Sequence, residues 1–322
     1  MRRVLITGAN GFIGANLTRR MLQEGMDVHL IVRPGYSDWR LRDITANAAV
    51  HELHLHDADS VRACVREARP QWVFHLAAHG AYSWQTDAEQ MLKTNLLGTV
   101  NLSEACAGTG FESFVYTGSS SEYGMKDHAP HEREFADPTS IYGASKLAAT
   151  HYCSYLARAR GLNMRTLRLY SVYGAYEEPK RLLPALIVNG LEGRLPKLVD
   201  GEIARDFVYI DDALDAIVLA ASTPSIADGE DTGGVYNVGS SRQTKLKQLV
   251  ELSRKIFSIA EEPHWGSMPN RNWDTTVWVA DTKRIHRDLG WSPKFTLEQG
   301  FIAMTDWLRS KPDMLSYYRQ SR

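Results

Sequence analysis

The sequence predicts an α/β protein with a doubly wound parallel sheet and a smaller C-terminal region, because three observations agree. Over the first two-thirds of the chain, short β-branched runs alternate with longer helical patterns. The first of these runs leads directly into a glycine-rich turn and a helical pattern, which is typical of a Rossmann-type sheet. The 322 residues leave room for one large domain and a smaller partner.

Five short runs have the length and the apolar, β-branched composition of buried strands. They are Val4–Ile6, Val28–Val32, Trp72–Leu76, Phe114–Tyr116 and Met164–Leu169. The longer patterns between them have the length of helices. These are Ile13–Glu24, Asp59–Arg69, Thr86–Ala107 and Tyr142–Arg160. Strands that alternate with helices in this way form a parallel sheet, which binds ligands at the carboxyl ends of its strands.

Beyond about residue 175, prolines and glycines break the chain into shorter elements. We therefore expect residues 1–175 to form a dinucleotide-binding domain. Residues 176–322 should form mainly a substrate-binding domain that caps the crevice of the sheet. Two strand-like runs in this second part, Phe207–Ile210 and Val235–Val238, are candidates to return to the main sheet.

The overall charge and the cysteines point to an ordinary intracellular protein. A net charge of −1 favours neither nucleic acid nor an anionic membrane, so an anionic ligand needs local positive groups. Cys64, Cys106 and Cys153 form no paired motif and should be free thiols in a reducing compartment. No apolar stretch approaches the roughly 20 residues that span a bilayer. The run before Gly8 is too short for a signal core. We expect a cytoplasmic protein with no metal site.

The turn after the first predicted strand carries Gly8, Gly11 and Gly14 in the stretch TGANGFIG. A tight turn and a close approach of the backbone to a pyrophosphate both exclude a Cβ atom. The helix that follows attracts negative charge to its N-terminus. The stretch therefore predicts a dinucleotide cofactor.

The end of the second predicted strand indicates which dinucleotide binds. An acidic residue there would hydrogen-bond the ribose 2′-hydroxyl of NAD, whereas arginine suits the 2′-phosphate of NADP. Arg33 occupies this place, so NADP(H) is the favoured cofactor and NAD remains possible. The nearby Asp38 and Arg40, and a solvated loop position for Arg33, leave the choice open.

Three residues are suited to moving a proton and a hydride. Tyr142 and Lys146 lie one helical turn apart and share a face, and the ammonium and a cationic nicotinamide both favour the phenolate. Lys146 is also expected to hydrogen-bond the nicotinamide ribose. Ser119 ends a buried strand, where its hydroxyl can bind the reacting oxygen while Tyr142 moves the proton. Asn95 lies in the middle of a helix, where it either braces this site or caps a neighbouring strand.

Seven stretches that occur in order make a wider resemblance plain. They are TGANGFIG, HLAA, TNLLGT, TGSSSEYG, YGASK, RLYSVYG and ARDFVYIDD. Over nearly its full length the chain resembles the extended short-chain dehydrogenase/reductases. That family includes UDP-galactose 4-epimerases, nucleotide-sugar 4,6-dehydratases, UDP-glucuronate decarboxylases and 4-ketosugar reductases. The resemblance implies a catalytic triad of Ser119, Tyr142 and Lys146. It also implies a homodimer held by a four-helix bundle from the helices Thr86–Ala107 and Tyr142–Arg160.

The same resemblance implies the residues that bind each ligand. The cofactor would contact Gly8, Asn10, Gly11, Phe12, Ile13, Gly14, Arg33, His54, Leu55, Leu76, Ala77, Ala78, Asn95, Tyr142 and Lys146. A nucleotide-diphosphate sugar would contact Ser83, Ser120, Ser121, Ser171, Leu198, Arg205 and Arg271.

Some of these assignments have alternatives. Arg205 and Arg271 match arginines that meet the diphosphate, but ion pairs with Asp206 or Asp274 would also explain them. Residues 195–199 would flank the base, and Tyr82 and Trp84 are candidates for the sugar pocket. The adenine-contacting aspartate of the family has no clear counterpart, so His54 or Asp57 would take its place. Ser171 stands where the family usually has asparagine.

The residues after the catalytic serine narrow the reaction. The 4,6-dehydratases carry Asp and Glu at the places of Ser120 and Ser121, the decarboxylases use that glutamate, and fucose-synthase-type enzymes have a cysteine at the second place. Glu122 lies one position later, so it should face the other way. Two reactions remain. Arg33 favours the reduction of a 4-keto-6-deoxy nucleotide sugar by NADPH, and the alternative is 4-epimerisation with retained NAD⁺.

Two further classes compete with a nucleotide-sugar enzyme. Some proteins of this fold bind the cofactor as regulators after losing the tyrosine, but Tyr142 is present here. A non-nucleotide ketone, such as a flavonoid, would also suit Arg33, but it gives no role to the paired arginines. The nucleotide, the sugar and the stereochemistry at C4 stay open.

Overall fold

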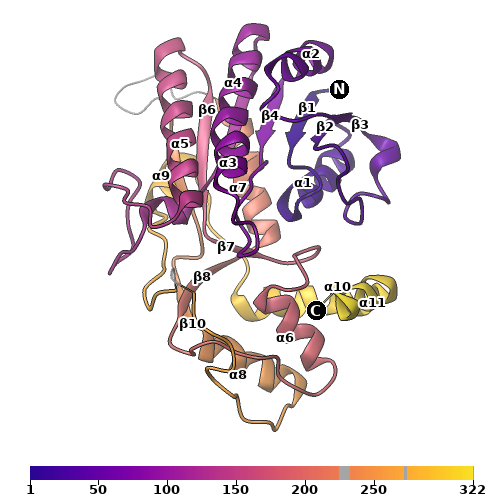
Figure 1. The fold of residues 1–322 in the computed structure, drawn as a ribbon, viewed down its shortest axis with the longest axis vertical. Helices are drawn as coiled ribbons and strands as arrows, with labels where there is room; N and C mark the ends of the chain where they lie inside the picture. The colour runs from indigo at the N-terminus through magenta and orange to yellow at the C-terminus, as the bar shows by residue number, and fades with distance from the viewer. Residues whose placement is uncertain (225–232, 272–273, 322) are drawn as a thin grey trace.

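The computed structural model describes residues 1–224, 233–271 and 274–321, and its main sheet has seven parallel strands (Figure 1). They are β1 (Arg3–Thr7), β2 (Asp27–Val32), β3 (Ala49–Glu52), β4 (Trp72–His75), β5 (Ser113–Ser119), β6 (Met164–Leu169) and β9 (Val235–Val238). Their order is β3-β2-β1-β4-β5-β6-β9. The order reverses between β1 and β4, so the ligand crevice is expected beyond the carboxyl ends of these two strands. The predicted fold class is confirmed.

All five predicted strands are present, with ends that differ by a few residues. β3 is not among them, because its side chains are mostly exposed at the edge of the sheet and the run A-V-H-E carries little apolar signal. Val235–Val238 joins the main sheet beside β6, as one of the two candidates.

The other candidate, Phe207–Ile210, does not return to the main sheet. β8 (Ala204–Tyr209) instead pairs with β7 (Ser171–Tyr173) and β10 (Gln243–Lys245) in a separate three-stranded sheet. The reason is that β7 follows almost directly on β6 and carries the chain past the edge of the main sheet. β8 then pairs with β7 in parallel, with Ser171 opposite Phe207.

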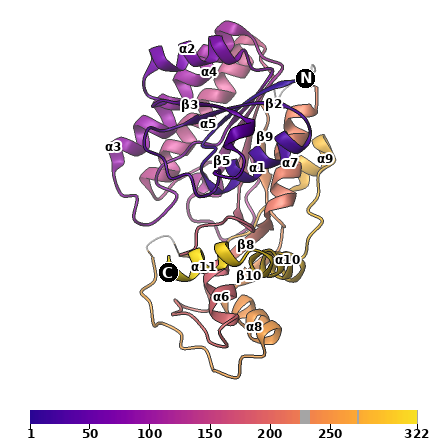
Figure 2. The same cartoon turned by 90° about the vertical axis from the view of Figure 1, so that its right-hand side faces the viewer.

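Helices cover both faces of the main sheet (Figure 2). On one face lie α1 (Phe12–Gln23) and α7 (Ile210–Ser222), and on the other lie α2 (Ala58–Ala68), α4 (Gly98–Thr109) and α5 (Ile141–Arg160). Each face has its own apolar core. The core under α1 and α7 continues without a break into the C-terminal part of the chain, so the two parts fold around shared apolar side chains.

The predicted helix Thr86–Ala107 consists of three segments. α3 (Ala88–Met91) leads into a π-helical stretch, η2 (Leu92–Leu97), before α4 begins. A π-helical turn changes which side chains face inward, and such turns are frequent at functional sites. Here it turns Asn95 into the protein, where the residue has no exposed surface.

The remaining elements lie mostly beyond the carboxyl edge of the main sheet (Figure 1). They are α6 (Leu182–Gly190), α8 (Leu246–Phe257), α10 (Leu297–Ser310) and α11 (Pro312–Gln320) around the small sheet, α9 (Lys283–Leu289) beside β9, and the 3₁₀ turns η1 (Thr45–Asn47) and η3 (Ser120–Tyr123). No helix in the described ranges is both long and apolar enough to cross a membrane. Cys64, Cys106 and Cys153 are buried and unpaired.

Candidate active site

A cavity of about 1520 Å³ lies between the carboxyl edge of the main sheet and the C-terminal part of the chain. Such a volume exceeds the usual range for a single small ligand, so it has room for a cofactor and a substrate together. Every residue that the sequence assigned to the cofactor, catalytic or substrate site lines this cavity except Asn95, and two of the alternative candidates, Asp57 and Trp84, also lie outside the lining. In the part of the chain that the structure describes, no group of His, Cys, Asp and Glu side chains is placed to hold a metal.

The glycine turn has no room for side chains. Gly8 has a φ of +68°, and a Cβ atom there would lie 2.6 Å from the backbone nitrogen of Ala77. A Cβ atom on Gly14 would lie 2.2 Å from the carbonyl oxygen of Gly8. Both distances are too short for a residue with a Cβ atom at either position. The backbone at the start of helix α1 therefore packs directly against the end of β1. This leaves bare backbone at a helix N-terminus, which suits the pyrophosphate of a dinucleotide.

A buried chain of hydrogen bonds supports this turn from behind. The Thr7 hydroxyl lies 2.6 Å from Nδ1 of His75, and Nε2 of His75 lies 2.8 Å from the Thr99 hydroxyl. The Ala77 backbone N–H donates to the Thr7 hydroxyl. Burial lowers the pKa of His75 to about 3, so this ring is a neutral bridge between the first strand and α4. Sequence reasoning missed this network because no local pattern links its members.

At the far end of the cavity, Arg33 is exposed and lines the wall directly after β2. Asp38 lies outside the lining and pairs with Arg42. Arg40 lines the cavity, but its guanidinium hydrogen-bonds the protein itself, since Nε donates to the Tyr176 carbonyl at 2.8 Å. Of the three residues that left the cofactor choice open, Arg33 alone both lines the cavity and faces solvent.

The two candidates for the adenine contact, His54 and Asp57, also differ in their position relative to the cavity. His54 lines the cavity and stacks on His56, with ring centroids 5.0 Å apart. Asp57 caps the N-terminus of α2, where its carboxylate accepts the backbone N–H groups of Asp59 and Ser60. A cap of this kind stabilises a helix, so a structural role accounts for Asp57.

The three proposed catalytic residues come from two neighbouring elements. Ser119 is the last residue of β5, and Tyr142 and Lys146 lie on the first turns of α5, whose N-terminus is capped by Ser140. Burial raises the pKa of Tyr142 to about 12, although a hydrogen bond with Ser119 acts in the opposite direction. The phenol is therefore protonated at neutral pH in the ligand-free protein.

Lys146 is almost fully buried, with 1% of its surface exposed. Its Nζ atom donates to the Thr117 carbonyl at 2.6 Å and lies 4.3 Å from the centre of the Tyr116 ring. Burial lowers its pKa to about 8, although the charge of Glu122 acts in the opposite direction. The amine thus remains largely charged at neutral pH but loses its proton easily.

Asn95 lies behind the cavity wall and does not line it. Its side chain accepts the His79 backbone N–H and donates to the His79 carbonyl and to the Ser145 hydroxyl, each at 2.8 Å. These bonds occupy the amide and tie η2 to α5 and to the loop after β4. The expected direct contact with the cofactor is therefore replaced by the bracing role, because the π-helical turn points the side chain inward.

The residues after Ser119 adopt the arrangement that the sequence predicts. Ser120 and Ser121 line the cavity, whereas Glu122 is fully buried and points away from it. The Glu122 carboxylate accepts the Ser119 backbone N–H at 2.8 Å and pairs with Arg168 at 2.8 Å. Glu122 thus holds the turn that presents Ser119, so it is not available as an acid or base for the substrate.

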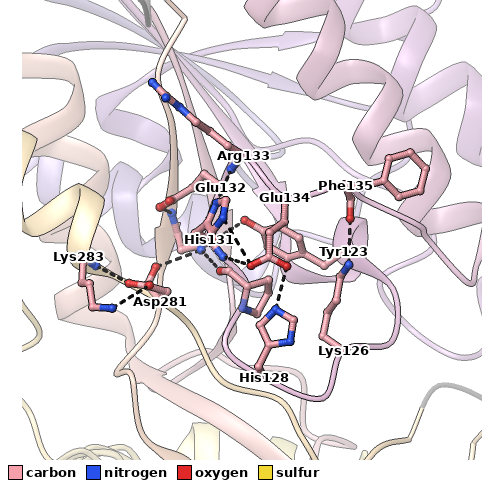
Figure 3. A network of polar contacts seen from close by, with 12 residues as sticks. Tyr123, Lys126, His128, His131, Glu132, Arg133, Glu134, Phe135, Asp281 and Lys283 are labelled. Carbon is pink, nitrogen blue, oxygen red and sulfur yellow. Dashed lines mark hydrogen bonds and ion pairs between the residues drawn. The ribbon is translucent and has the colours of Figure 1, made fainter.

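Residues 124–140 connect η3 to α5, and the two ends of this segment, residues 124–125 and 139–140, form part of the rim of the cavity. Figure 3 shows polar contacts of its middle part. Asn237 on β9 anchors this segment by donating to the Pro130 carbonyl, while its own backbone N–H donates to the Glu132 carboxylate. At the exposed tip, His128 bridges Asp127 and Glu134. Asn237 is buried and the region of His128 is exposed, so residues 124–140 are held in place mainly by their contacts with Asn237.

On the substrate side, Arg205 forms an ion pair with Asp274 within the cavity wall. The other carboxylate oxygen of Asp274 accepts the Arg271 backbone N–H at 2.8 Å. The ion pair with Asp274, one of the alternatives for Arg205, is therefore present. Both arginines still line the cavity. Burial lowers the pKa of Arg205, although the Asp274 charge acts in the opposite direction.

The rest of the expected substrate residues are divided as follows. Ser83, Ser171 and Leu198 line the cavity. Tyr82 also lines it, but Trp84 is 54% exposed and lies outside the lining, where it stacks on Tyr82. The exposed indole of Trp84 therefore does not line the cavity.

Sequence reasoning missed four lining residues that bear on ligand binding. Trp265, whose ring packs on Gly201, and Trp278, whose ring lies edge-on to Tyr170, supply aromatic surface in the cavity wall. Glu177 and Arg181 lie between β7 and α6. Their stretch, E-E-P-K-R, looks like an ordinary solvated charge cluster, and only the fold shows that all five of its members line the cavity.

The model of the NAD dependent epimerase/dehydratase family matches residues 4–239 of this chain. The chain belongs to this family. The match covers all seven strands of the main sheet and the three proposed catalytic residues. Its limits also show that the epimerase/dehydratase region extends well beyond the glycine turn and through β9.

Three relatives show the range of this family. The UDP-glucose 4-epimerase of Mycolicibacterium smegmatis is 29% identical over 96% of this chain and 99% of its own length. A trifunctional UDP-glucose 4,6-dehydratase/UDP-4-keto-6-deoxy-D-glucose 3,5-epimerase/UDP-4-keto-L-rhamnose-reductase of Arabidopsis thaliana is 27% identical over 97% of this chain, which spans about half (48%) of that protein. The structure of MoeE5 in complex with UDP-glucuronic acid and NAD has a TM-score of 0.82 and 29% identity, covering 96% of this chain and 99% of that one.

Proposed function

We propose that this epimerase/dehydratase family member is an NAD(P)(H)-dependent nucleotide-sugar oxidoreductase that acts by hydride transfer at sugar C4. The observation that carries the proposal is the shared cavity. Ser119, Tyr142 and Lys146 line the same space as the glycine turn at one end and the two arginines, Arg205 and Arg271, at the other. The relatives named above act on nucleotide sugars or bind one together with NAD, which supports the same substrate class.

The residues of the chain divide the chemistry among them. Tyr142, which is protonated at neutral pH, gives its proton to the oxygen at C4 as that oxygen gains negative charge. Ser119 hydrogen-bonds the same oxygen and holds it in line with the phenol. The buried Lys146 ammonium stabilises the phenolate that remains. When bound, the nicotinamide supplies the hydride to C4 or removes it.

A nucleotide-diphosphate sugar fits the remaining lining. Arg205 and Arg271 provide planar donors for two phosphates, although Arg205 must share its donors with Asp274. Leu198, Trp265 and Trp278 provide apolar and aromatic surface for a base. This combination explains why the cavity is locally basic in a chain of nearly neutral net charge.

Within this class we favour the reduction of a 4-keto-6-deoxy nucleotide sugar by NADPH. Ser120 and Ser121 line the cavity where a dehydratase would need carboxylates, and Glu122 is used elsewhere. Arg33 lines the cavity directly after β2, a position at which an arginine suits the 2′-phosphate of NADPH. A reductase exchanges its cofactor in every cycle, so a site built for NADPH is expected of it.

A second candidate is nucleotide-sugar 4-epimerisation with retained NAD⁺. It is favoured by the UDP-glucose 4-epimerase relative, which matches this chain almost from end to end. The same three catalytic residues would then act twice, and the keto sugar would rotate in the site between the two hydride transfers. A cofactor-binding regulator without catalysis is a weaker candidate, since Ser119, Tyr142 and Lys146 all line the cavity.

One set of assays on the purified full chain tests these alternatives. A reductase oxidises NADPH when 4-keto-6-deoxy nucleotide sugars are added. An epimerase carries tightly bound NAD⁺ and interconverts UDP-glucose and UDP-galactose. In either case Tyr142→Phe should lower turnover at least about a hundredfold while cofactor binding stays unchanged. If neither reaction occurs in the wild type across the UDP, dTDP, GDP and CDP series, the enzymatic proposal is wrong.

A further inference from the structure

Two adjacent glutamates after β7 each face an arginine, but their surroundings differ. Glu178 pairs with Arg40 at 3.3 Å, and a fifth of its side-chain surface is exposed. Glu177 lies 3.7 Å from Nε of Arg181 and is buried, with 5% of its surface exposed. Among the described residues, the second carboxyl oxygen of Glu177 has no hydrogen-bond partner at all. A buried oxygen without a partner is costly, so this carboxyl group calls for an explanation.

The backbone holds Glu177 in the cavity wall. Tyr176 has a φ of +66°, a left-handed conformation that is costly for a tyrosine. Three side chains from separate elements fix this strained turn. Asn16 on α1 donates to the Ala175 carbonyl, Arg40 donates to the Tyr176 carbonyl, and Tyr318 on α11 donates to the Glu177 carbonyl. The carboxyl group therefore cannot leave its place by a small shift of the loop.

Arg181 lies near both the catalytic Tyr142 and the substrate-side Arg205. Its side chain is 39% exposed and lines the cavity. It lies near enough to Tyr142 and to Arg205 for its charge to lower the pKa of each. A guanidinium in this position can reach the diphosphate of a substrate whose C4 lies at Tyr142.

We propose that Glu177 is a positioning residue that sets the availability of Arg181 to the substrate diphosphate. As a neutral carboxyl group it leaves the guanidinium in the cavity. As a carboxylate it draws the guanidinium into the wall and away from the substrate. The proposal rests on the nucleotide-sugar function proposed above and adds a device that regulates the affinity of that site.

The charge state of Glu177 supports this arrangement. Burial raises its pKa to about 8, although the charges of Arg181 and Arg40 act in the opposite direction. The carboxyl group is then neutral at pH 7 and ionises within the accessible alkaline range. A bound diphosphate would further disfavour the carboxylate, so binding should take up a proton near pH 8. The charged and titratable groups that face it are Arg40, Tyr82, Tyr173, Glu178, Arg181 and Tyr318.

The affinity of a nucleoside diphosphate measures this device without any turnover. We expect the Kd of the tightest binder among UDP, dTDP, GDP and CDP to rise by up to about tenfold between about pH 7 and about pH 9. Titration calorimetry in buffers of different ionisation enthalpy should show proton uptake on binding near pH 8. Glu177→Gln, which mimics the neutral form, should keep the low Kd at all these pH values.

Two further variants isolate the effect. Glu178→Gln removes the neighbouring carboxylate, which also lines the cavity but pairs with Arg40 rather than Arg181, and should keep the wild-type pH dependence. Arg181→Ala should weaken binding and remove the dependence. Lys146 also titrates near pH 8, but it is present in all of these variants, so the difference between Glu177→Gln and Glu178→Gln belongs to Glu177.

Several results would overturn the inference. A wild-type Kd that does not change with pH, or the absence of proton uptake, would contradict it without any variant. A pH dependence that persists in Glu177→Gln would assign the titration to another group. If no nucleoside diphosphate binds at any pH, the proposed substrate class fails and the inference fails with it. Binding that is tight but independent of pH contradicts the inference alone.

Discussion

Lys146 shows how the environment of a single side chain sets its chemistry. The amine is buried between the Tyr116 ring and the Thr117 carbonyl, and no ion pair with a carboxylate is found for it among the residues that the structure describes. This surrounding lowers its pKa far enough for the charge to be lost within the working range of an enzyme. Tyr142 remains protonated over the same range, so the two members of the pair titrate separately.

We predict that kcat at saturating substrate falls as the pH rises through about 8, because the Lys146 ammonium that stabilises the phenolate is lost. The measurement is the pH profile of kcat. Lys146→Ala should lower kcat at least about a hundredfold and abolish this alkaline limb. A wild-type kcat that stays level to about pH 9.5 would show that the charge on Lys146 is not needed.

A second prediction concerns Arg33. Arg33→Ala should raise the KM for NADPH by roughly tenfold or more, because a charge-assisted contact with the 2′-phosphate is lost. The KM for NADH should change little. Arg42→Ala, which removes an exposed arginine paired with Asp38 outside the cavity, is the matched control. An NADH-preferring wild type whose preference survives Arg33→Ala would overturn the cofactor assignment.

At the scale of elements, the connection between η3 and α5 depends on one buried residue. Asn237 on β9 has no exposed surface, accepts the Tyr123 hydroxyl and donates to the carbonyls of Pro130 and Asp281. Through these bonds the edge strand of the main sheet holds the rim of the cavity. The rim also carries the N-cap of α5, so its position bears on Tyr142.

We predict that Asn237→Ala lowers the free energy of unfolding by about 2–4 kcal/mol, because it removes three hydrogen bonds at a buried position, those to the Tyr123 hydroxyl and to the Pro130 and Asp281 carbonyls. Urea denaturation checks this. His128→Ala, at the exposed tip of the same segment, should leave the stability nearly unchanged. Equal effects of the two substitutions would show that the anchor at β9 is unimportant.

The sequence predicted the elements best where a pattern is local and repeated. The buried strands and the longer helices of the main sheet were found, because apolar periodicity and the glycine turn are properties of adjacent residues. The π-helical turn at Asn95 was not predicted, since its inward-facing amide is defined by partners on α5 and after β4. The run Phe207–Ile210 was a candidate for the main sheet but forms β8 of the small sheet, because a strand pattern does not specify which strand it pairs with.

In the candidate site, too, residues within local motifs could be predicted from the sequence. Ser119, Tyr142 and Lys146 stand in short motifs and were identified from them, as were the glycines. The support by Thr7 and His75, and the roles of Glu177 and Arg181, depend on contacts between residues far apart in the chain, which a single sequence does not reveal.

At the scale of the whole molecule, the outer surface of the α4–α5 layer carries exposed apolar side chains. Leu92 and Leu97 on η2 and Tyr155 on α5 are 47%, 44% and 59% exposed. A group of large apolar side chains on helices is expected to be covered by a partner. This is the surface through which the sequence predicts a homodimer by a four-helix bundle.

We predict that Leu97→Glu converts a dimer to a monomer, because it places a charge within the bundle. Light scattering after size-exclusion chromatography gives the mass directly. Ile302→Glu changes a similarly exposed apolar residue on α10 and should leave the dimer intact. A wild type that is monomeric at micromolar concentration, or a Leu97→Glu dimer, would argue against this interface.

The seventh strand of the main sheet has a consequence for biosynthesis. β9 is made from residues 235–238, long after β6 has left the ribosome, and two strands of the small sheet, β7 and β8, and two helices are synthesised in between. Until then one edge of β6 presents unpaired backbone groups, which readily recruit other strands. A fragment that stops at residue 175 would carry this bare edge permanently. Its tendency to aggregate would reflect a missing strand rather than a faulty nucleotide-binding half.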